Sequence, residues 1–254
     1  MGAGHAHALY IHEHSPLHRI APEAKLLATL GMVISVAVTP REQVWAFGVY
    51  ALMVSILIWV ARVPAKFVAV RLLGVAPFVL FALLIPFIAT GETTVVWGLE
   101  MSVDGLWATW NILAKTILGA SVTIVLTATT EVPDMIEGLG ILRVPALFVS
   151  ITMFMIRYLE LVADELGRMR LAMAARGYDP SGLHQVRPIA SSAGTLFVRS
   201  YERGERVHAA MLSRGFTGTM PDLGHRHATA AEWLAVGALM SIFVLIAVMA
   251  LVRS

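Results

Sequence analysis

Long apolar stretches alternate with short polar segments along this chain. A helix needs about 20 mainly apolar residues to cross a bilayer, with about 17 to 25 as the usual range. Five stretches reach or approach that length, near residues 24–38, 43–61, 67–90, 105–129 and 229–251. The pattern predicts an all-α fold, a polytopic membrane helix bundle of about five spans. Pro77 and Pro86 predict a bend in the third span.

The segment between the fourth and fifth stretches, residues 131–228, has a different pattern. Charged side chains crowd both of its halves, at Arg157, Glu160, Asp164, Glu165, Arg168 and Arg170 and again at Arg199, Glu202, Arg203, Glu205 and Arg206. Each charge at the centre of a membrane helix costs roughly 2.5 to 3.5 kcal/mol on insertion scales. The sequence therefore predicts no membrane span in this segment.

Both halves of that segment nevertheless have a helical period. Apolar residues recur at three- and four-residue steps from Pro145, which suits a helix start, and they include Phe148, Ile151, Met155, Tyr158, Val162 and Met173. A helix over 145–176 is predicted, about 48 Å long at 1.5 Å per residue. A second amphipathic helix is predicted over 190–214 and a short one over 132–139.

The two long predicted helices end alike. The first ends in Arg168-x4-Met173-x2-Arg176-Gly177-Tyr178 and the second in Arg206-x4-Met211-x2-Arg214-Gly215-Phe216. Glycine suits the position after a helix cap, because it adopts the left-handed conformation without a steric cost. The following Asp179-Pro180 disfavours continuation of the first helix.

The arginine of each ending has two interpretations. A cation near a helix C-terminus complements the helix dipole, which is worth about 0.3 to 1 kcal/mol. Alternatively, an arginine at the end of a rigid helix can enter a groove of a partner and pair with carboxylates through its planar guanidinium. Because the whole pattern is duplicated, the sequence favours partner docking at Arg176 and Arg214.

Composition agrees with a membrane protein. Hydrophobic residues make up 57% of the chain and charged residues 14%, with a mean hydropathy of +0.75, whereas a soluble domain is about one quarter charged. The chain has no cysteine, which excludes disulfides and thiolate metal sites. The first twenty residues carry five histidines and lack the apolar core of a signal peptide.

Basic residues predict the orientation, because cytoplasmic loops are enriched in lysine and arginine. They flank the first span and the turn between the second and third spans, at Arg19, Lys25, Arg62, Lys66 and Arg71, and eleven arginines fall within 131–228. The turn that holds Glu92, Glu100 and Asp104 has no basic residue. The N-terminus and segment 131–228 are therefore placed in the cytoplasm, with Arg41 and Arg253 as exceptions.

Motifs of enzymes are missing. No G-x4-G-K-[ST] phosphate loop exists, since Lys25, Lys66 and Lys115 each follow an alanine. The chain also has no H-E-x-x-H zinc-protease motif and no G-x-S-x-G nucleophile elbow. A membrane enzyme is disfavoured, no catalytic residue is assigned, and the chain has no recognisable means of holding ATP.

The histidines offer a weak candidate metal site. His5, His7, His12 and His14 precede the first span, and neutral imidazole is the commonest metal ligand in proteins. Without rigid spacing or a carboxylate pattern, a weakly ligating tail is favoured. A stand-alone metal carrier or channel that used these histidines would need ligands inside the spans, where only Lys115 and Asn111 stand out. An intramembrane lysine is a functional candidate by default, but a bond from Lys115 to Asn111 or to threonine hydroxyls is favoured.

The order of these features resembles a known family. The chain has a Ser15-Pro16-Leu17-His18-Arg19-Ile20 to Pro22-Glu23-Ala24-Lys25 lead-in, four spans, Met155-Ile156-Arg157-Tyr158, two Arg-Gly endings and a last span. Over nearly its whole length it resembles the transmembrane T subunit of energy-coupling-factor (ECF) transporters. The run from Arg157-Tyr158-Leu159-Glu160 to Ala175-Arg176-Gly177-Tyr178-Asp179-Pro180 is most similar to the CbiQ type of cobalt and nickel uptake systems.

The resemblance implies partners in a prokaryotic cell membrane and no binding of nucleic acid. Such a T subunit holds two ABC-type ATPase subunits, which bind ATP and Mg²⁺, and a CbiM-like substrate-binding membrane S subunit, and it allows a small accessory membrane subunit. The triplets Ala175-Arg176-Gly177 and Ser213-Arg214-Gly215 would sit in ATPase grooves, with Ser213 departing from the alanine of the pattern. No cofactor is expected on this chain. An importer of a vitamin is the alternative within the family.

The predicted spans and the charged segment between them divide the chain into four parts. Residues 1–23 form a His-rich cytoplasmic segment, 24–130 the first four spans, 131–228 a cytoplasmic coupling-helix domain, and 229–254 the last span. In the coupling domain an apolar surface would receive the S subunit, with Phe148, Met155, Phe197 and Met211 as candidates. Packing between the two long helices is the other interpretation of these four residues.

Overall fold

A computed structural model describes residues 10–11, 15–90, 92–96, 99–178, 186–218 and 227–253. Contacts group the chain into two units. We call the first the bundle, which comprises Ala8–Gly138 and Arg226–Ser254, and the second the rod pair, which comprises Leu139–His225. The bundle therefore continues through most of the short helix that the sequence assigned to the coupling domain.

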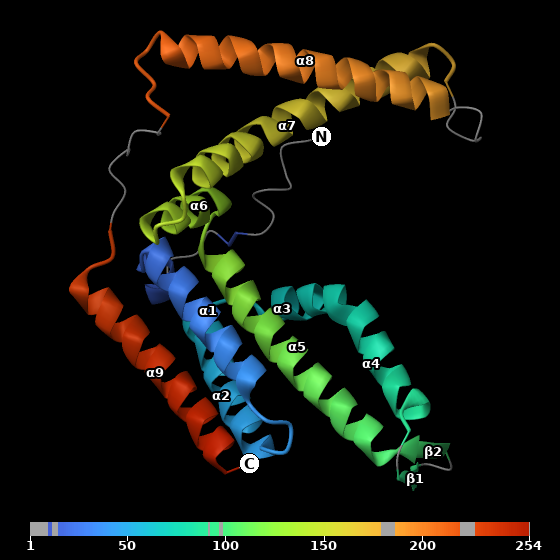
Figure 1. Ribbon diagram of the computed structural model, residues 1–254, viewed down its shortest axis with the longest axis vertical. Coiled ribbons are helices and arrows are strands. Elements are labelled where there is room, and N and C mark those ends of the chain that lie inside the picture. Colours follow the sequence, from blue (N-terminus) through green and yellow to red (C-terminus); the bar gives the residue numbers. More distant parts are fainter. Residues whose placement is uncertain are drawn as a thin grey trace. The chain divides into compact units, whose positions relative to one another are not determined.

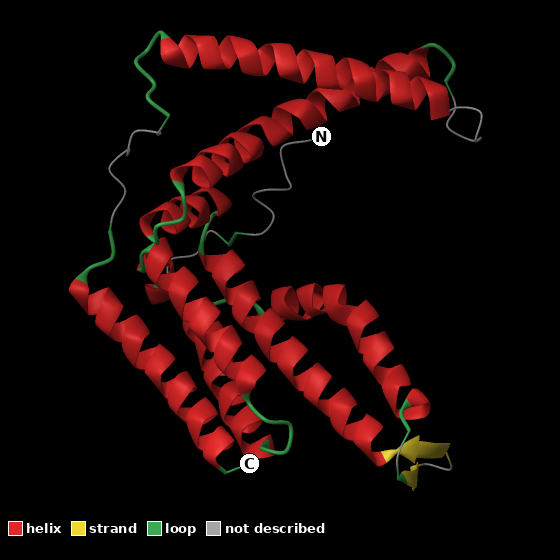
Figure 2. Cartoon of the chain, in the orientation of Figure 1, coloured by secondary structure: helices red, strands yellow, loops and turns green. Residues whose placement is uncertain are grey.

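The bundle consists of apolar helices, as the sequence predicts (Figures 1 and 2). Its elements are η2 Pro16–Arg19, α1 Pro22–Val38, α2 Val44–Val60, α3 Ala65–Leu72, η3 Leu73–Val75, α4 Ala76–Ile88, β1 Thr93–Val96, β2 Leu99–Ser102, α5 Val103–Thr129 and α9 Ala230–Val252. Each of the five predicted apolar stretches coincides with helical structure to within two residues at either end. The all-α prediction is confirmed, apart from the short hairpin of β1 and β2.

The third apolar stretch is bent, as its prolines predict. The helical segment Ala65–Ile88 changes to a 3₁₀ turn at η3, and Pro77 lies in the first turn of α4. Proline suits that position because it lacks an N–H that the first helical turn would leave unpaired. Figure 1 shows α3 and α4 running in different directions on either side of η3. The bend therefore lies just before Pro77, while Pro86 is accommodated inside α4.

The core of the bundle lies among α1, α2, α5 and α9. Tyr50 of α2 and Phe243 of α9 are fully buried, and their rings stack at 5.1 Å between centroids. The Tyr50 hydroxyl donates a hydrogen bond of 3.2 Å to the carbonyl oxygen of Phe243. On the α1 side, a Cβ added to Gly31 would lie 2.5 Å from the sulfur of Met240. Glycine therefore permits the close approach of α1 and α9.

The rod pair consists mainly of two long helices. Its elements are α6 Val132–Ile141, which begins in the bundle, α7 Ala146–Ala175 and α8 Val186–Leu212. Ser192 of α8 donates to the sulfur of Met173 at 3.4 Å, and Arg199 of α8 bonds to Glu165 of α7. Late residues of α7 thus meet early residues of α8, so the two helices run antiparallel. No described side chain of α7 or α8 is buried.

Length and composition allow four helical segments to cross a membrane, namely Ala65–Ile88, α5, α7 and α9, and α2 is a shorter apolar helix. The inclusion of α7 departs from the prediction that 131–228 contains no such segment. The reason is the distribution of charge within α7, because no charged residue occurs from Ala146 to Ile156 and the charges begin at Arg157. Conversely α1, with Glu23 and Lys25 in its first turns, is outside this set.

Candidate partner-docking site

The end of α7 is closed by a complete Schellman motif. The N–H of Tyr178 donates to the carbonyl of Met173 at 3.1 Å, and the N–H of Gly177 donates to that of Ala174 at 3.0 Å. Gly177 has a φ of +78°, the left-handed conformation that this motif requires after the cap residue. Arg176 is therefore the cap residue itself, and it is exposed together with Ala175 and Gly177.

The end of α8 repeats this geometry bond for bond. Phe216 N–H donates to the carbonyl of Met211 at 3.0 Å, and Gly215 N–H to that of Leu212 at 3.0 Å. Gly215 has a φ of +84°, and Arg214 occupies the cap position that Arg176 holds on α7. Ser213, Arg214 and Gly215 are all exposed. We call the two ends, residues 173–178 and 211–216, the tips.

The cap explains most of the duplicated sequence pattern. In a Schellman motif the residue after the glycine commonly makes an apolar contact with the residue three positions before the cap. Those positions are Tyr178 and Met173 at one tip and Phe216 and Met211 at the other, all four half-buried. Methionine, glycine and aromatic ring are therefore parts of a helix stop. The arginine is the member of the pattern that the cap does not require.

The two arginines of each repeat differ in their pairing. The upstream arginines form ion pairs within their own helices, Arg168 with Glu165 at 2.6 Å and Arg206 with Glu202 at 3.9 Å. By contrast, neither Arg176 nor Arg214 has an ion-pair partner within the described parts of the chain. Because α7 and α8 run antiparallel, these two free guanidinium groups lie at opposite ends of the rod pair.

Ser213, the residue that breaks the Ala-Arg-Gly pattern, is bonded locally. Its hydroxyl donates to the carbonyl oxygen of Ala210 at 2.9 Å, and its N–H donates to that of Ala209 at 3.1 Å. A serine that bonds back to its own helix presents less polarity to a partner than its side chain alone suggests. The second tip therefore keeps the backbone geometry of the first despite the substitution.

An apolar groove of about 490 Å³ runs between α7 and α8. Met155 and Met211 both line it, together with Tyr158, Val207 and Phe216. Two of the four candidates for an apolar partner surface thus come together in one groove. Phe148 and Phe197, the other two, do not line it, and these residues are 62% and 71% exposed.

A second duplication, which the sequence reasoning missed, occurs at two helix junctions. The run Arg-Val-Pro-Ala-x-Phe-Val is found at 62–68 and again at 143–149. At the first junction, Val63 N–H donates to the carbonyl of Ile58 at 3.2 Å, and at the second, Val144 N–H donates to that of Leu139 at 3.1 Å. These are the same i to i−5 bonds as at the tips. A search for internal repeats beyond the two tips would have found this signal.

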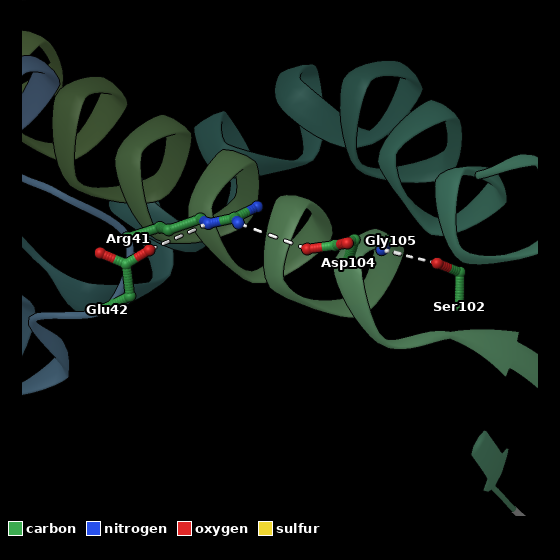
Figure 3. A network of polar contacts seen from close by, with 5 residues as sticks. All are labelled: Arg41, Glu42, Ser102, Asp104 and Gly105. Carbon is green, nitrogen blue, oxygen red and sulfur yellow. Dashed lines mark hydrogen bonds and ion pairs between the residues drawn. The ribbon is translucent and has the colours of Figure 1, made fainter. Parts of the chain in front are cut away.

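The intramembrane lysine, Lys115, has a partner within the bundle, and so do the two exceptions to the orientation rule, Arg41 and Arg253. Lys115 donates to the carbonyl of Ala37 at 2.7 Å rather than to Asn111, which agrees with a structural role. Arg41 pairs with Glu42 at 3.3 Å and with Asp104 at 3.4 Å (Figure 3). Arg253 lies over the ring of Trp45, 5.9 Å from its centroid. Both arginines that depart from the charge asymmetry are therefore engaged within the bundle.

The histidine candidates His5, His7, His12 and His14 lie outside the described residues. The neighbouring His18 has a structural environment. Its Nε2 donates to the carbonyl of Ile11 at 3.1 Å, so its Nδ1 accepts from the Ser15 hydroxyl at 2.7 Å when the ring is neutral. Among residues that the structure describes, no group of three or more possible metal ligands occurs.

The apolar helices and the exposed rod pair define a multi-pass membrane protein. Comparison with known families identifies the family of this protein. The model of the CbiQ family, described as a cobalt transport protein, matches residues 13–226. The chain belongs to the CbiQ family and is a transmembrane T subunit of the ECF transporters. Members of this family are transport components, which agrees with the absence of enzyme motifs from the sequence.

Individual relatives are similar over most of this chain. The energy-coupling factor transporter transmembrane protein EcfT of Streptococcus thermophilus is 26% identical, with 83% of this chain and 84% of that protein covered. The nickel permease LarQ of Lactiplantibacillus plantarum is 26% identical, with 89% and 77% covered. The putative fused cobalt transport protein CbiMQ of Methanocorpusculum labreanum is 25% identical, with 81% of this chain but 36% of that longer protein covered.

Proposed function

We propose that this T subunit couples ATP hydrolysis by two ABC-type ATPase subunits to import through a membrane S subunit. The observation that carries the proposal is the pair of tips, each with a free, exposed arginine on the same rigid cap. A guanidinium group whose backbone is already fixed loses less conformational entropy on binding than one on a flexible loop. Carboxylates in a groove of each ATPase are the expected partners, with Ala175, Gly177, Ser213 and Gly215 small enough to enter beside the arginines.

Coupling follows from the antiparallel arrangement of the rods. The tips lie at opposite ends, and α8 with its 27 residues is about 40 Å long. When ATP binding draws the two ATPases together, the two tips are moved toward each other, and the rods must change their crossing or slide. The weak interface between α7 and α8, with no buried described side chain, allows such a change.

The groove between the rods is the proposed site of the S subunit. Met155 and Met211 line it, and methionine adapts its flexible side chain to a moving partner. Phe148 and Phe197 extend the apolar surface beyond the groove, since both are mainly exposed. Movement of the rods would then reorient the S subunit and its cargo.

Cobalt or nickel is the proposed cargo. The family is described as a cobalt transport protein, and one relative is named a nickel permease. The fused CbiMQ protein supports a CbiM-like S subunit as the membrane partner, and a small accessory membrane subunit is compatible with it. ATP and Mg²⁺ are assigned to the ATPases, and no cofactor is assigned to this chain. The proposed location is a prokaryotic cell membrane, with the N-terminus and rod pair in the cytoplasm.

Reconstitution into proteoliposomes tests the proposal. Cobalt uptake should require this chain, the S subunit, the ATPases and ATP together, and each preparation that lacks one component serves as a control. Competition by nickel or by a vitamin would identify another cargo. Cobalt uptake by this chain alone, without any ATPase, would contradict the proposal and favour a stand-alone carrier that uses the N-terminal histidines.

A further inference from the structure

The first turn of α1 bonds to backbone beside both connections between the bundle and the rod pair. On the way to the rod pair, α5 ends at Thr129 and leads into α6, which begins in the bundle. On the way back, Ala228 lies in the bundle two residues before α9 begins. Glu23 and Lys25 of α1 reach these two places. Both residues are buried, with exposed fractions of 1% for Glu23 and 8% for Lys25. Buried ionisable groups are costly unless they are bonded, so the bonds that these two make are informative.

Glu23 binds the backbone just before α9. Its Oε1 accepts a hydrogen bond of 2.6 Å from the backbone N–H of Ala228. Ala228 directly precedes Thr229, the N-cap of α9, which forms a capping box with Glu232. A helix N-terminus carries a partial positive charge, so the Glu23 carboxylate is favoured beside it. Glu23 therefore fixes the chain two residues before α9 begins.

Lys25, which has the opposite charge, binds the end of α5. Its Nζ donates to the carbonyl oxygen of Thr129 at 2.8 Å, at the C-terminal end of α5, where a cation is favoured. The adjoining α6 packs closely against the same turn. A Cβ added to Gly138 of α6 would lie only 3.0 Å from the backbone nitrogen of Glu23. One turn of α1 thus carries an acid to the start of α9 and a base to the end of α5.

Burial alone does not require this arrangement. Glu23 and Lys25 form no ion pair with each other in the described structure, although they lie two residues apart. Glu23 binds backbone just before α9, and Lys25 binds backbone at the end of α5. Lys66, the remaining lysine besides Lys115, is exposed on α3. This turn therefore places one buried charge beside each of the two connections to the rod pair.

We propose that the first turn of α1 is an anchor through which motion of the rod pair reaches the bundle. Glu23 and Lys25 act as its positioning residues, Glu23 toward α9 and Lys25 toward α5. The inference rests on the proposed coupling function, since it concerns what happens after the ATPases have moved the tips. Without the anchor, the connections would absorb the movement, and α5 and α9 would not follow.

Amide hydrogen exchange of the complete complex in nanodiscs, with and without Mg-ATP, tests the anchor. In the parent complex, ATP should change exchange both at the tips and in α5 and α9. In Glu23→Met and Lys25→Met, which keep side-chain volume but remove the polar group, the tips should respond as before. The response of α5 and α9 should fall by at least about fivefold, the lower limit of typical coupling between sites.

Matched variants separate coupling from general damage. Glu92→Gln and Lys66→Met change an exposed acid and an exposed lysine and should keep the full response. Glu23→Gln keeps an oxygen that can accept from Ala228 and should restore part of it. If Glu23→Met assembles poorly, Glu23→Cys with Ala228→Cys can be joined by a bifunctional thiol reagent, because the chain has no other cysteine. The response should then depend on the cross-link.

The outcomes that contradict the anchor differ from those that contradict the docking proposal. An intact complex in which both methionine variants keep the full response of α5 and α9 overturns the anchor alone. In the isolated chain, Glu23→Met must also speed exchange of the Ala228 amide, and unchanged exchange there overturns the anchor without any partner. ATPases that fail to bind the parent chain at all would instead contradict the proposed function.

Discussion

Four helices of this chain end in the same hydrogen bonds, yet the two pairs of ends use arginine in opposite ways. At the tips, Gly177 and Gly215 take the left-handed conformation, with φ of +78° and +84°, and the arginine stays one residue earlier on the cap. At the ends of α2 and α6, Arg62 and Arg143 take that conformation themselves, with φ of +56° and +67°. Valine and proline then lead directly into the next helix.

The difference shows which arginines the fold itself uses. A left-handed conformation costs an L-residue roughly 1 to 2 kcal/mol, whereas glycine adopts it freely. At Arg62 and Arg143 the arginine is a member of the turn, and the following proline fixes the entry into α3 or α7. At the tips, glycine makes the turn and leaves the arginine outside it. The tip arginines therefore have a position that capping does not explain.

The largest expected effect comes from removing the tip arginines. Arg176→Ala with Arg214→Ala should abolish co-purification of the ATPase subunits, because truncating one partner of a buried charged hydrogen-bonded pair costs about 2 to 5 kcal/mol. Each single variant should already weaken binding by about 30-fold or more, since every 1.4 kcal/mol is tenfold. Surface plasmon resonance with the purified ATPases measures the effect.

The junction arginines provide the matched control for that experiment. Arg62→Ala with Arg143→Ala removes the same two charges from ends with the same hydrogen bonds, and it should leave ATPase binding within about twofold. Equal losses in the two double variants would show that net positive charge, rather than the tips, attracts the ATPases. Full binding by the tip variant would remove the docking proposal.

Helix periodicity and glycine placement predicted the rods and their ends well. The sequence predicted helices over 145–176 and 190–214, and the structure has α7 over Ala146–Ala175 and α8 over Val186–Leu212. These features are local, because apolar spacing and a glycine stop act within a few residues. Placing glycine after the cap already implied that Arg176 and Arg214 are the cap residues, and the backbone bonds confirm it.

Long-range packing explains what the sequence could not supply. Lys25 and Lys115 were visible as lysines, but their carbonyl partners, Thr129 and Ala37, depend on the packing of α1 against α5. Likewise, the acceptor role of Glu23 depends on a residue far along the chain. The grouping of Met155 with Met211 required the antiparallel rods. Sequence spacing carries no information about which of these helices become neighbours.

Exchanging the left-handed residues should affect the two pairs of ends in opposite directions. Gly177→Ala or Gly215→Ala places a Cβ in a left-handed position and should destabilise the tip by about 1 kcal/mol, shifting the arginine and weakening ATPase binding several-fold. Arg62→Gly or Arg143→Gly relieves the same strain and should raise stability by roughly 0.5 kcal/mol. Thermal unfolding in detergent, beside the binding measurement, detects both changes.

The sign of each change is the informative result. If Arg62→Gly or Arg143→Gly lowered stability or impaired ATPase binding, these arginines would have a role beyond the turn, and the contrast with the tips would disappear. Unchanged ATPase binding in Gly177→Ala would indicate that the ATPase groove tolerates a displaced arginine. The contrast predicts a loss of binding at the glycines and a gain of stability at the junction arginines.

The smallest expected effect is at Ser213, which distinguishes the two tips from each other. Its hydroxyl is bonded to the Ala210 carbonyl, so Ser213→Ala removes one exposed local bond and makes the second triplet match the first. Serine and alanine differ little in size, and exposed substitutions away from special geometry stay within about 0.5 kcal/mol. ATPase binding should therefore change by no more than about twofold. A larger gain in affinity would show that Ser213 weakens the second tip, and the reciprocal Ala175→Ser should then weaken the first by the same factor.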